Sequence, residues 1–214
     1  MPAVHSLLRV ADIDALAWES DAPDWVFESL RCAPFVVVRR ALPRSDALPV
    51  GVRGRRRSQR AAAWLALGAV RDCVTPPMLI AAGAWRHCDL PVTPAVGVLD
   101  QAAAVFAAHG LGGRWGPGGS VGFELASGVS HTTSASDLDI VLRADLPLGR
   151  GNAAHLLSDL SRLPVRIDVL LETPNGAVAL AEYASSLGLM LLRTASGPRW
   201  VRNPWRAHRD SDQP

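Results

Sequence analysis

The sequence predicts a mixed α/β (α+β) protein, in which helices cover a mixed β-sheet and a smaller α+β domain comes first. Short runs rich in Val and Ile, typical of buried strands, alternate with longer helical patterns in the second half of the chain. The first third has apolar runs of its own, and the loop at Pro91 and Pro94 separates it from that half. We therefore expect two domains, at residues 1–78 and 79–214.

The composition excludes several classes of protein. Hydrophobic residues make up 49% and charged residues 20% of the 214 positions, which argues against disorder. The apolar stretches are shorter than the roughly 20 residues that span a bilayer, and the N-terminus lacks the layout of a signal peptide. The three cysteines have no C-x-x-C spacing and predict neither disulfides nor a zinc site. We therefore expect a cytoplasmic protein with no membrane partner.

All 22 basic residues are arginine. Any cationic side chain that contacts a phosphate must therefore be an arginine, whose forked guanidinium suits phosphate oxygens. The net charge of +2 is small for a surface that follows a nucleic-acid backbone, which argues against nucleic acid as a partner.

The N-terminal third is expected to contain a strand and two helices. The run of β-branched residues at 35–39 predicts the strand. Ser58 is a candidate N-cap for a helix that runs to about Asp72. Thr75 precedes a proline, which fits the first turn of a helix, so we expect a second helix from there to about His87.

Helices and strands are expected to alternate in the rest of the chain. A helix at 98–109 leads into a turn with seven glycines between Gly110 and Gly122. The elements expected afterwards are helices at 121–127, 152–163 and 177–185, and strands at 137–143, 165–172, 189–193 and 199–201.

The string SDLDIVL at 136–142 carries the clearest chemical signal. Side chains in a strand alternate between two faces, so Asp137 and Asp139 share one face while the apolar residues take the other. Two carboxylates this close repel each other unless a cation lies there, and Mg²⁺ binds carboxylate and phosphate oxygens. The alternative is a pair of solvated aspartates at the edge of a strand.

Two further features favour a metal site. Asp168 is the single acid in the apolar string VRIDVLL, where an unpaired charge beside a core is costly. If this strand lies beside the first, Asp168 completes a three-carboxylate cluster that can hold two metal ions. Gly119 and Ser120 close the glycine-rich turn just before a helix, where backbone N–H groups favour bound phosphate.

The order of these motifs resembles that of the nucleotidyltransferase superfamily that includes DNA polymerase beta. Six strings more closely resemble the phosphoribosyl-dephospho-CoA transferases of malonate decarboxylase systems, also called malonate decarboxylase holo-acyl-carrier-protein synthases. These strings are PVGVRG (49–54), GSVGFELASG (119–128), SDLDIVLRA (136–144), VRIDVLLETPNGAVALAEYA (165–184), LLRT (191–194) and NPW (203–205). The likeness therefore extends over nearly the whole chain.

The resemblance implies a nucleotidyltransferase-type mixed sheet and a reaction. The phosphoribosyl-dephospho-CoA part of 2′-(5″-triphosphoribosyl)-3′-dephospho-CoA would move to a serine of the apo acyl carrier subunit of malonate decarboxylase, and pyrophosphate would leave. Asp137 and Asp139 would bind Mg²⁺, with Mn²⁺ as a substitute. Asp168 would bind a second ion or act as a base, and Gly119 and Ser120 would hold the leaving phosphates.

Further residues are candidates for substrate contacts. A basic run either binds the donor or an acidic carrier protein, or is a solvated loop. It consists of Arg53, Arg55, Arg56, Arg57 and Arg60. Trp115 is either a platform for an adenine or sugar, or a core residue. His131 is either a substrate contact or an ordinary loop residue. Glu124 is either an acid that supports the site residues or, as we expect, a surface residue.

Three functions fit these motifs. The first is the transferase that modifies a carrier protein. The second is another metal-dependent nucleotidyltransferase, which acts on a protein, an RNA or a small molecule. The third is a non-enzymatic adaptor that retains the fold, but the three intact acids and the Gly-Ser turn argue against it.

Overall fold

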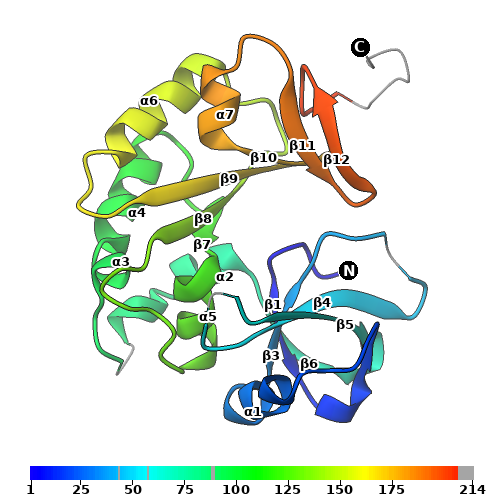
Figure 1. The fold of residues 1–214 in the computed structure, drawn as a ribbon. Helices are drawn as coiled ribbons and strands as arrows, with labels where there is room; N and C mark the ends of the chain where they lie inside the picture. Colours follow the sequence, from blue (N-terminus) through cyan, green and yellow to red (C-terminus); the bar gives the residue numbers. More distant parts are fainter. Residues whose placement is uncertain (43, 57, 88–89, 207–214) are drawn as a thin grey trace.

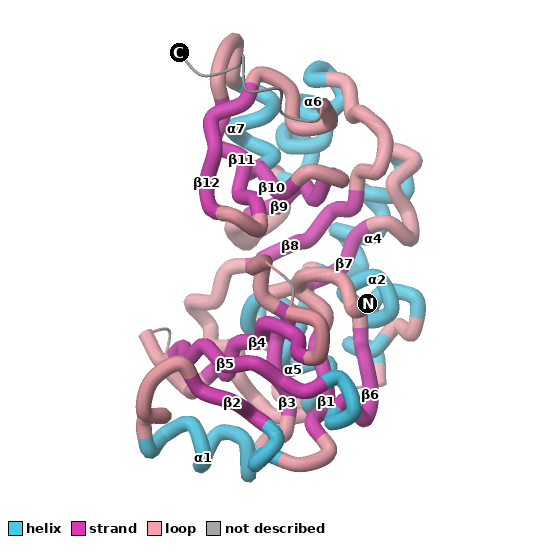
Figure 2. Tube along the Cα trace, turned by 90° about the vertical axis from the view of Figure 1, so that its right-hand side faces the viewer, coloured by secondary structure: helices cyan, strands magenta, loops and turns pink. Residues whose placement is uncertain are grey.

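The computed structural model describes residues 1–42, 44–56, 58–87 and 90–206 (Figure 1). These residues form two six-stranded sheets. One sheet contains the strands of the N-terminal part, which ends at Val74, and the other contains the strands from Trp115 onwards, in the C-terminal part. Figures 1 and 2 show the two sheets as separate tiers, one above the other.

The first sheet is antiparallel and has the order β2-β5-β4-β3-β1-β6. Its strands are β1 (Leu7–Val10), β2 (Leu16–Trp18), β3 (Phe35–Val38), β4 (Ala47–Arg53), β5 (Arg60–Ala66) and β6 (Val70–Val74), with 3-10 turns η1 (Ile13–Ala15) and η2 (Leu67–Ala69). Helix α1 (Asp24–Cys32) buries Val26 and Leu30 in the core of this part. The strand predicted at 35–39 is confirmed as β3.

The helix predicted from Ser58 to Asp72 is wrong. This segment forms β5 and β6 instead, and β5 pairs with β4 from Ala66 to Arg60. The consecutive residues Ala63, Trp64 and Leu65 are all buried, as in a strand that is covered on both faces. The alanines favour a helix in isolation, but the hydrogen bonds and packing that a neighbouring strand provides outweigh that preference.

The second sheet is mixed and has the order β12-β11-β10-β9-β8-β7. Its strands are β7 (Trp115–Pro117), β8 (Leu138–Arg143), β9 (Ile167–Thr173), β10 (Gly176–Ala179), β11 (Met190–Thr194) and β12 (Gly197–Val201). Among these strands only β8 and β9 pair in parallel, and helix α6 (Arg150–Leu160) connects them. With α4 (Leu99–Ala108) and α7 (Leu180–Ser185), it covers the face of this sheet that lies away from the first sheet (Figure 1).

The predicted α+β class is confirmed, while two helix boundaries differ from prediction. The helix after Thr75 is α2 (Pro76–Ala81), which ends early because Gly83 has a left-handed φ of 58°, and the 3-10 turn η3 (Ala84–Arg86) follows. Residues 177–179, predicted as helix, belong to β10. A short helix α3 (Pro94–Gly97) precedes α4. No helix among the described residues has the length and apolar character needed to cross a membrane.

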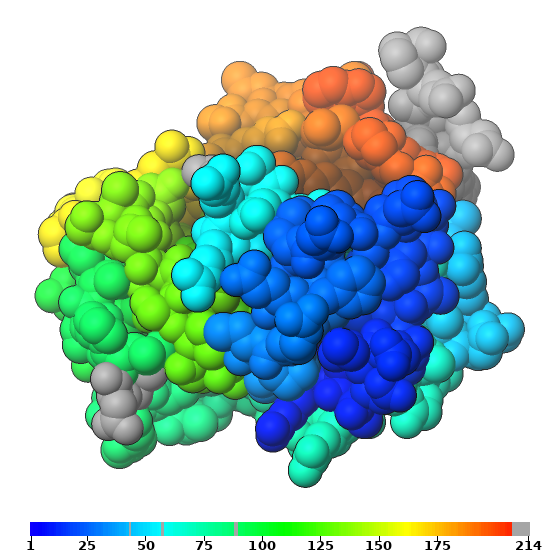
Figure 3. All heavy atoms as spheres, turned by 60° about the horizontal axis from the view of Figure 1, so that its bottom comes forward, coloured from blue at the N-terminus to red at the C-terminus, as the bar shows by residue number. Residues whose placement is uncertain are grey.

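An apolar contact joins the two parts of the chain. Helix α5 (Gly119–Ser127) contributes Phe123, which packs against Leu7 and Ala33 of the N-terminal part in one buried cluster. Figure 3 shows the N-terminal residues (blue) lying directly against residues of the C-terminal part (green) on this side of the molecule. Burial of this cluster holds the N-terminal part against α5, close to where that helix begins.

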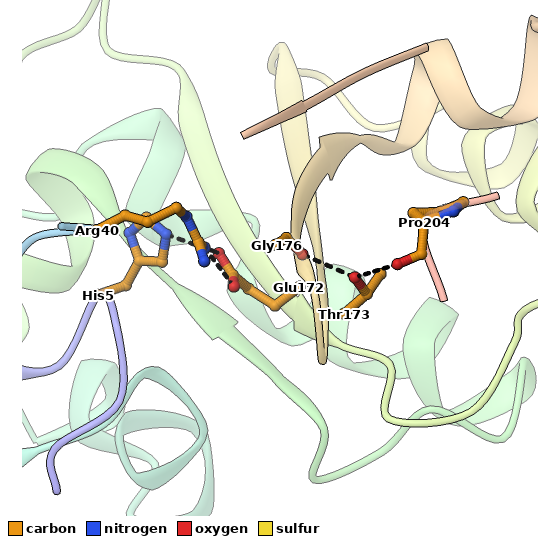
Figure 4. A network of polar contacts seen from close by, with 6 residues as sticks. All are labelled: His5, Arg40, Glu172, Thr173, Gly176 and Pro204. Carbon is orange, nitrogen blue, oxygen red and sulfur yellow. Dashed lines mark hydrogen bonds and ion pairs between the residues drawn. The ribbon is translucent and has the colours of Figure 1, made fainter. Parts of the chain in front are cut away.

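A polar contact at Glu172, in β9, also joins the two parts (Figure 4). Arg40 donates hydrogen bonds from Nη2 to both carboxylate oxygens of Glu172, and His5 Nε2 lies 3.0 Å from Oε1. The side chains of Glu172 and Arg40 are only 15% and 19% exposed. The next residue, Thr173, donates to the carbonyls of Gly176 and Pro204. The end of β9 is therefore fixed on both sides.

This contact makes stability depend on pH. Burial raises the pKa of Glu172, but the hydrogen bonds from His5 and Arg40 lower it more, so the pKa lies below the usual value for a glutamate. A carboxylate with a depressed pKa stabilises the folded state above its unfolded pKa of about 4.3. That stabilisation is lost as the pH falls through the folded pKa.

We expect Glu172→Gln to destabilise the protein by about 3 kcal/mol at pH 7, because Arg40 loses its counter-charge in a largely buried position. Urea denaturation measures the change. The matched control is Asp145→Asn, at an exposed aspartate, which should alter the free energy of unfolding little. The difference between wild type and Glu172→Gln should shrink below pH 4. A difference that does not depend on pH would contradict the ionic role.

Candidate active site

A cleft of about 780 Å³ lies between the two sheets and contains most of the predicted site residues. One wall comes from β8, β9 and the start of α5, and the opposite wall comes from the arginines at the ends of β4 and β5. The predicted residues that line it are Gly119, Ser120, His131, Asp137, Asp139, Asp168, Arg53, Arg55 and Arg60. Residues from both parts of the chain thus face one space.

The parallel pairing of β8 with β9 brings the acids together. Asp139 lies opposite Asp168 in the register of the two strands, and Asp137 immediately precedes β8. Leu138 and Ile140, which alternate with the aspartates, are 0% and 1% exposed. The apolar face of β8 is therefore anchored in the core, and its acidic face is directed to the cleft.

The three carboxylates provide only oxygen ligands, which suit a hard divalent cation. Nη2 of Arg166 lies 3.1 Å from Oδ2 of Asp168, in a pair whose side chains are 71% and 50% exposed. As the side chains stand, no three His, Cys, Asp or Glu residues of the described segments are close enough to hold a metal ion. An exposed ion pair is weak, so Asp168 can exchange Arg166 for an ion by a side-chain rotation. With the Asp168 side chain rotated away from Arg166, the three acids fit a divalent cation.

The glycine turn lies directly against Asp139. Gly119 has a φ of 53°, and a Cβ at this position would stand 1.9 Å from Oδ2 of Asp139. The backbone N–H of Gly118 donates to the carbonyl of Asp139 at 2.8 Å. The first turn of α5 therefore opens into the cleft beside an acid, and its N–H groups and dipole favour an anion there.

Glu124 was expected at the surface, and that prediction is wrong, because its exposure is 1%. Its Oε2 accepts hydrogen bonds from the backbone N–H groups of His131 and Thr132, both at 2.7 Å, and from the Thr132 hydroxyl at 2.9 Å. Glu124 thereby fixes the loop that leads into β8. The signal for this role was its position in a helix with apolar residues on both sides, at Phe123 and Leu125.

His131 lies where this loop approaches the arginines. Its ring packs edge-to-face on Phe123, with 4.5 Å between the ring centroids. Burial lowers the pKa of His131, and the charges of Arg53 and Arg55 lower it further, against an opposing effect of Glu124. The ring is therefore neutral at pH 7 and offers one hydrogen-bond donor and one acceptor to the cleft.

Two predicted residues among the described ones do not line the cleft. Trp115 is 1% exposed and stacks on Phe106 at 4.4 Å, so the predicted contact with an adenine or sugar is corrected to a packing role in the core. Arg56 lines a side pocket of about 360 Å³, which shares Arg55 and His131 with the cleft. Arg57 lies outside the described residues.

Two residues with titratable side chains in the cleft lining were not predicted. Arg193, on β11, lines the cleft and belongs to the LLRT string, whose resemblance to the family does not by itself mark a site residue. His5 also lines it, and bonds to Glu172 as described. No local pattern marks His5, because its partner is 167 residues away in the sequence.

Comparisons with known proteins agree with this architecture. The family model described as "Phosphoribosyl-dephospho-CoA transferase MdcG C-terminal domain" matches residues 82–204, and the model of the corresponding N-terminal domain matches residues 3–76. The chain belongs to the phosphoribosyl-dephospho-CoA transferase family. The family name describes a transferase. The boundary between its two domain models lies between β6, the last strand of the N-terminal part, and η3.

Curated relatives share this name over nearly their whole length. A phosphoribosyl-dephospho-CoA transferase of Azotobacter vinelandii (strain DJ) is 41% identical over 206 residues, which cover 96% of this chain and 95% of that protein. One of Klebsiella pneumoniae (strain 342) is 39% identical over 209 residues, which cover 98% of each chain. No solved structure gives a significant match.

We expect Gly119→Ala to reduce transferase activity by at least about 100-fold, or roughly 3 kcal/mol, because the added Cβ displaces the Asp139 carboxylate. The matched control is Gly128→Ala at the other end of α5, where φ is 69° and nothing lies within 4 Å of the new Cβ. That variant should lose about 1 kcal/mol of stability through left-handed strain, and little activity. Steady-state rates and urea denaturation of both variants measure the two effects. Equal activity losses would contradict a specific role for Gly119.

Proposed function

We propose that this protein transfers the phosphoribosyl-dephospho-CoA group of 2′-(5″-triphosphoribosyl)-3′-dephospho-CoA to a serine of the apo acyl carrier subunit of malonate decarboxylase. Pyrophosphate is the second product. The observation that carries the proposal is a single cleft with three carboxylates and a helix N-terminus on one wall, and three arginines on the other. The names of the family and of its curated members support the choice of donor.

In this reaction, the serine oxygen bonds to the α-phosphorus of the donor. The bond from that phosphorus to the β-phosphate oxygen breaks, and the hydroxyl proton goes to a base. Asp137 and Asp139 are the proposed ligands of Mg²⁺, or of Mn²⁺ in its place, which when bound would neutralise phosphate charge. Asp168 either accepts the serine proton at its carboxylate or completes the ligand set.

The other cleft residues position the donor. The backbone N–H groups at Gly119 and Ser120 bind the departing phosphates at the start of α5. Arg53, Arg55 and Arg60 bind further donor phosphates from the opposite wall, where guanidinium groups form charge-assisted hydrogen bonds. Catalysis of phosphoryl transfer consists mainly of such positioning and charge neutralisation.

The direct test is intact-mass spectrometry of the apo acyl carrier subunit after incubation with the donor, Mg²⁺ and this protein. The expected result is a mass increase equal to one phosphoribosyl-dephospho-CoA group, located on a serine, with release of pyrophosphate. Addition of EDTA, which chelates Mg²⁺, should prevent formation of the modified carrier. No modification of the carrier by the wild-type protein would refute the proposed function.

We expect Asp139→Asn to lower the rate of this transfer by several orders of magnitude, because the proposed metal loses a ligand. The free energy of unfolding in metal-free buffer should change little, since Asn keeps the size of the Asp139 side chain at an exposed position of β8. Asp145→Asn again serves as the control for loss of one surface carboxylate. A near-normal rate for Asp139→Asn would remove Asp139 from the site.

We expect Arg55→Gln to raise the KM for the donor by about 10-fold, the effect of losing one charge-assisted contact, while kcat changes little. The control is Arg71→Gln, which removes the same charge from an exposed position of β6 outside the cleft. Initial rates at varied donor concentration distinguish the two variants. An equal KM for both would leave Arg55 without a role in donor binding.

A further inference from the structure

The hairpin of β11 and β12 is strongly basic. Residues 183–206 contain four arginines, at positions 193, 199, 202 and 206, and no aspartate or glutamate. Arg193, Arg199 and Arg202 are exposed, and none of them forms an ion pair with another residue in the described parts of the chain. Within the described part of the chain, this segment therefore presents positive charge without ion-pair partners at the edge of the second sheet.

The strand register shows which way the hairpin faces. Cross-strand partners point to the same side of a sheet, and one row runs from Glu172 through Ala177 and Arg193 to Pro198. Glu172 faces the N-terminal part, where it binds Arg40 and His5. The side chain of Arg193 therefore lies on that same face, in agreement with its position in the cleft lining.

The same face carries an exposed aromatic residue next to the cleft. Leu191, two residues before Arg193, pairs with Trp200 on the edge strand β12. Trp200 is 55% exposed although it is a large apolar side chain, and it does not line the cleft. An exposed tryptophan among arginines matches the composition of protein–protein hot spots. The cleft face of the sheet thus continues outwards into a surface suited to a protein.

From this we infer that the β11–β12 patch, which consists of Leu191, Arg193, Trp200 and Arg202, docks the protein acceptor through an acidic face next to its serine. The inference rests on the proposed function, because it assumes that the acceptor is a protein. Arg193 belongs to both the patch and the cleft, so a partner bound at the patch lies at the entrance of the cleft. Opposite charges then accelerate the encounter and orient the acceptor.

Other occupants fit the patch less well. The donor phosphates have Arg53, Arg55 and Arg60 inside the cleft, whereas Trp200 and Arg202 lie outside its lining. A second copy of this chain on a two-fold axis would bring the same arginines together, and their charges would repel. A protein with an acidic surface offers negative charge to the arginines and apolar contact area to the tryptophan.

The test compares the double variant Trp200→Ser/Arg202→Gln with a control double variant, Leu67→Ser/Arg71→Gln. The control removes an apolar side chain of 42% exposure and an exposed arginine from the N-terminal part, outside the cleft. The patch variant should raise the KM for the apo acyl carrier subunit by at least about 10-fold, the effect of losing one hot-spot side chain and one steering charge. The KM for the donor and kcat at saturating acceptor should stay at the wild-type values.

Salt provides a second readout. The KM of the wild-type protein for the acceptor should rise between 50 and 300 mM NaCl, because the Debye length falls from about 14 Å to about 6 Å over this range. The KM of the patch variant should depend less on salt. Urea denaturation verifies that both double variants are folded. An exposed tryptophan on an edge strand contributes little to the core, so the patch variant should unfold at nearly the wild-type urea concentration.

Each outcome is decisive. An unchanged acceptor KM in the patch variant, with normal labelling by the wild type, overturns the docking site and leaves the proposed function intact. A higher donor KM with an unchanged acceptor KM assigns the patch to the donor and also overturns the inference that the patch docks the acceptor. A wild-type dimer that dissociates in the patch variant with no change in acceptor KM makes the patch a self-association surface. Failure of the wild type to label the carrier refutes the proposed function itself, and with it this inference.

Discussion

Asp139 and Asp168 lie opposite each other on two parallel strands, where their like charges repel. The strands withstand this repulsion because their other faces are anchored by Leu138 and Ile140, which are almost fully buried. The parallel pairing itself depends on α6, which carries the chain from the end of β8 to the start of β9. The apolar core of the C-terminal part therefore maintains the acidic edge, where a bound cation would compensate the negative charge.

The same face of β9 also determines the position of the opposite wall. Glu172 lies four residues after Asp168, on the same side of the strand, and binds Arg40 and His5 of the N-terminal part. The Phe123 cluster fixes that part at a second place, near α5. With two separate contacts, the arginines at the ends of β4 and β5 face the acids across a cleft of defined width. Loss of either contact would change the width of the cleft even though neither contact includes Asp137, Asp139 or Asp168.

The motifs around the acids could be predicted from sequence because their signals are local. Alternation identified the strand at Asp139, and the glycines identified the turn before α5. Long-range packing could not be predicted in this way. Trp115 lies in a glycine turn, but its ring is covered only when α4 brings Phe106 against it. Likewise the segment 58–72 has the alanine content of a helix, and it forms strands because β5 pairs with β4 and β2 while β6 pairs with β1.

Charge also gives a reason why the proposed reaction would use both parts of the chain. An anionic donor is repelled by the wall that carries Asp137 and Asp139, so that wall alone binds it only together with a cation. The arginine wall attracts the same donor but lacks the acids that would hold a metal. In the proposed reaction the acceptor is anionic as well, and a shared basic surface would make the two substrates compete. The proposed second basic surface at β11–β12, which shares Arg193 with the cleft, would allow both to be bound at once while the serine reaches the phosphate.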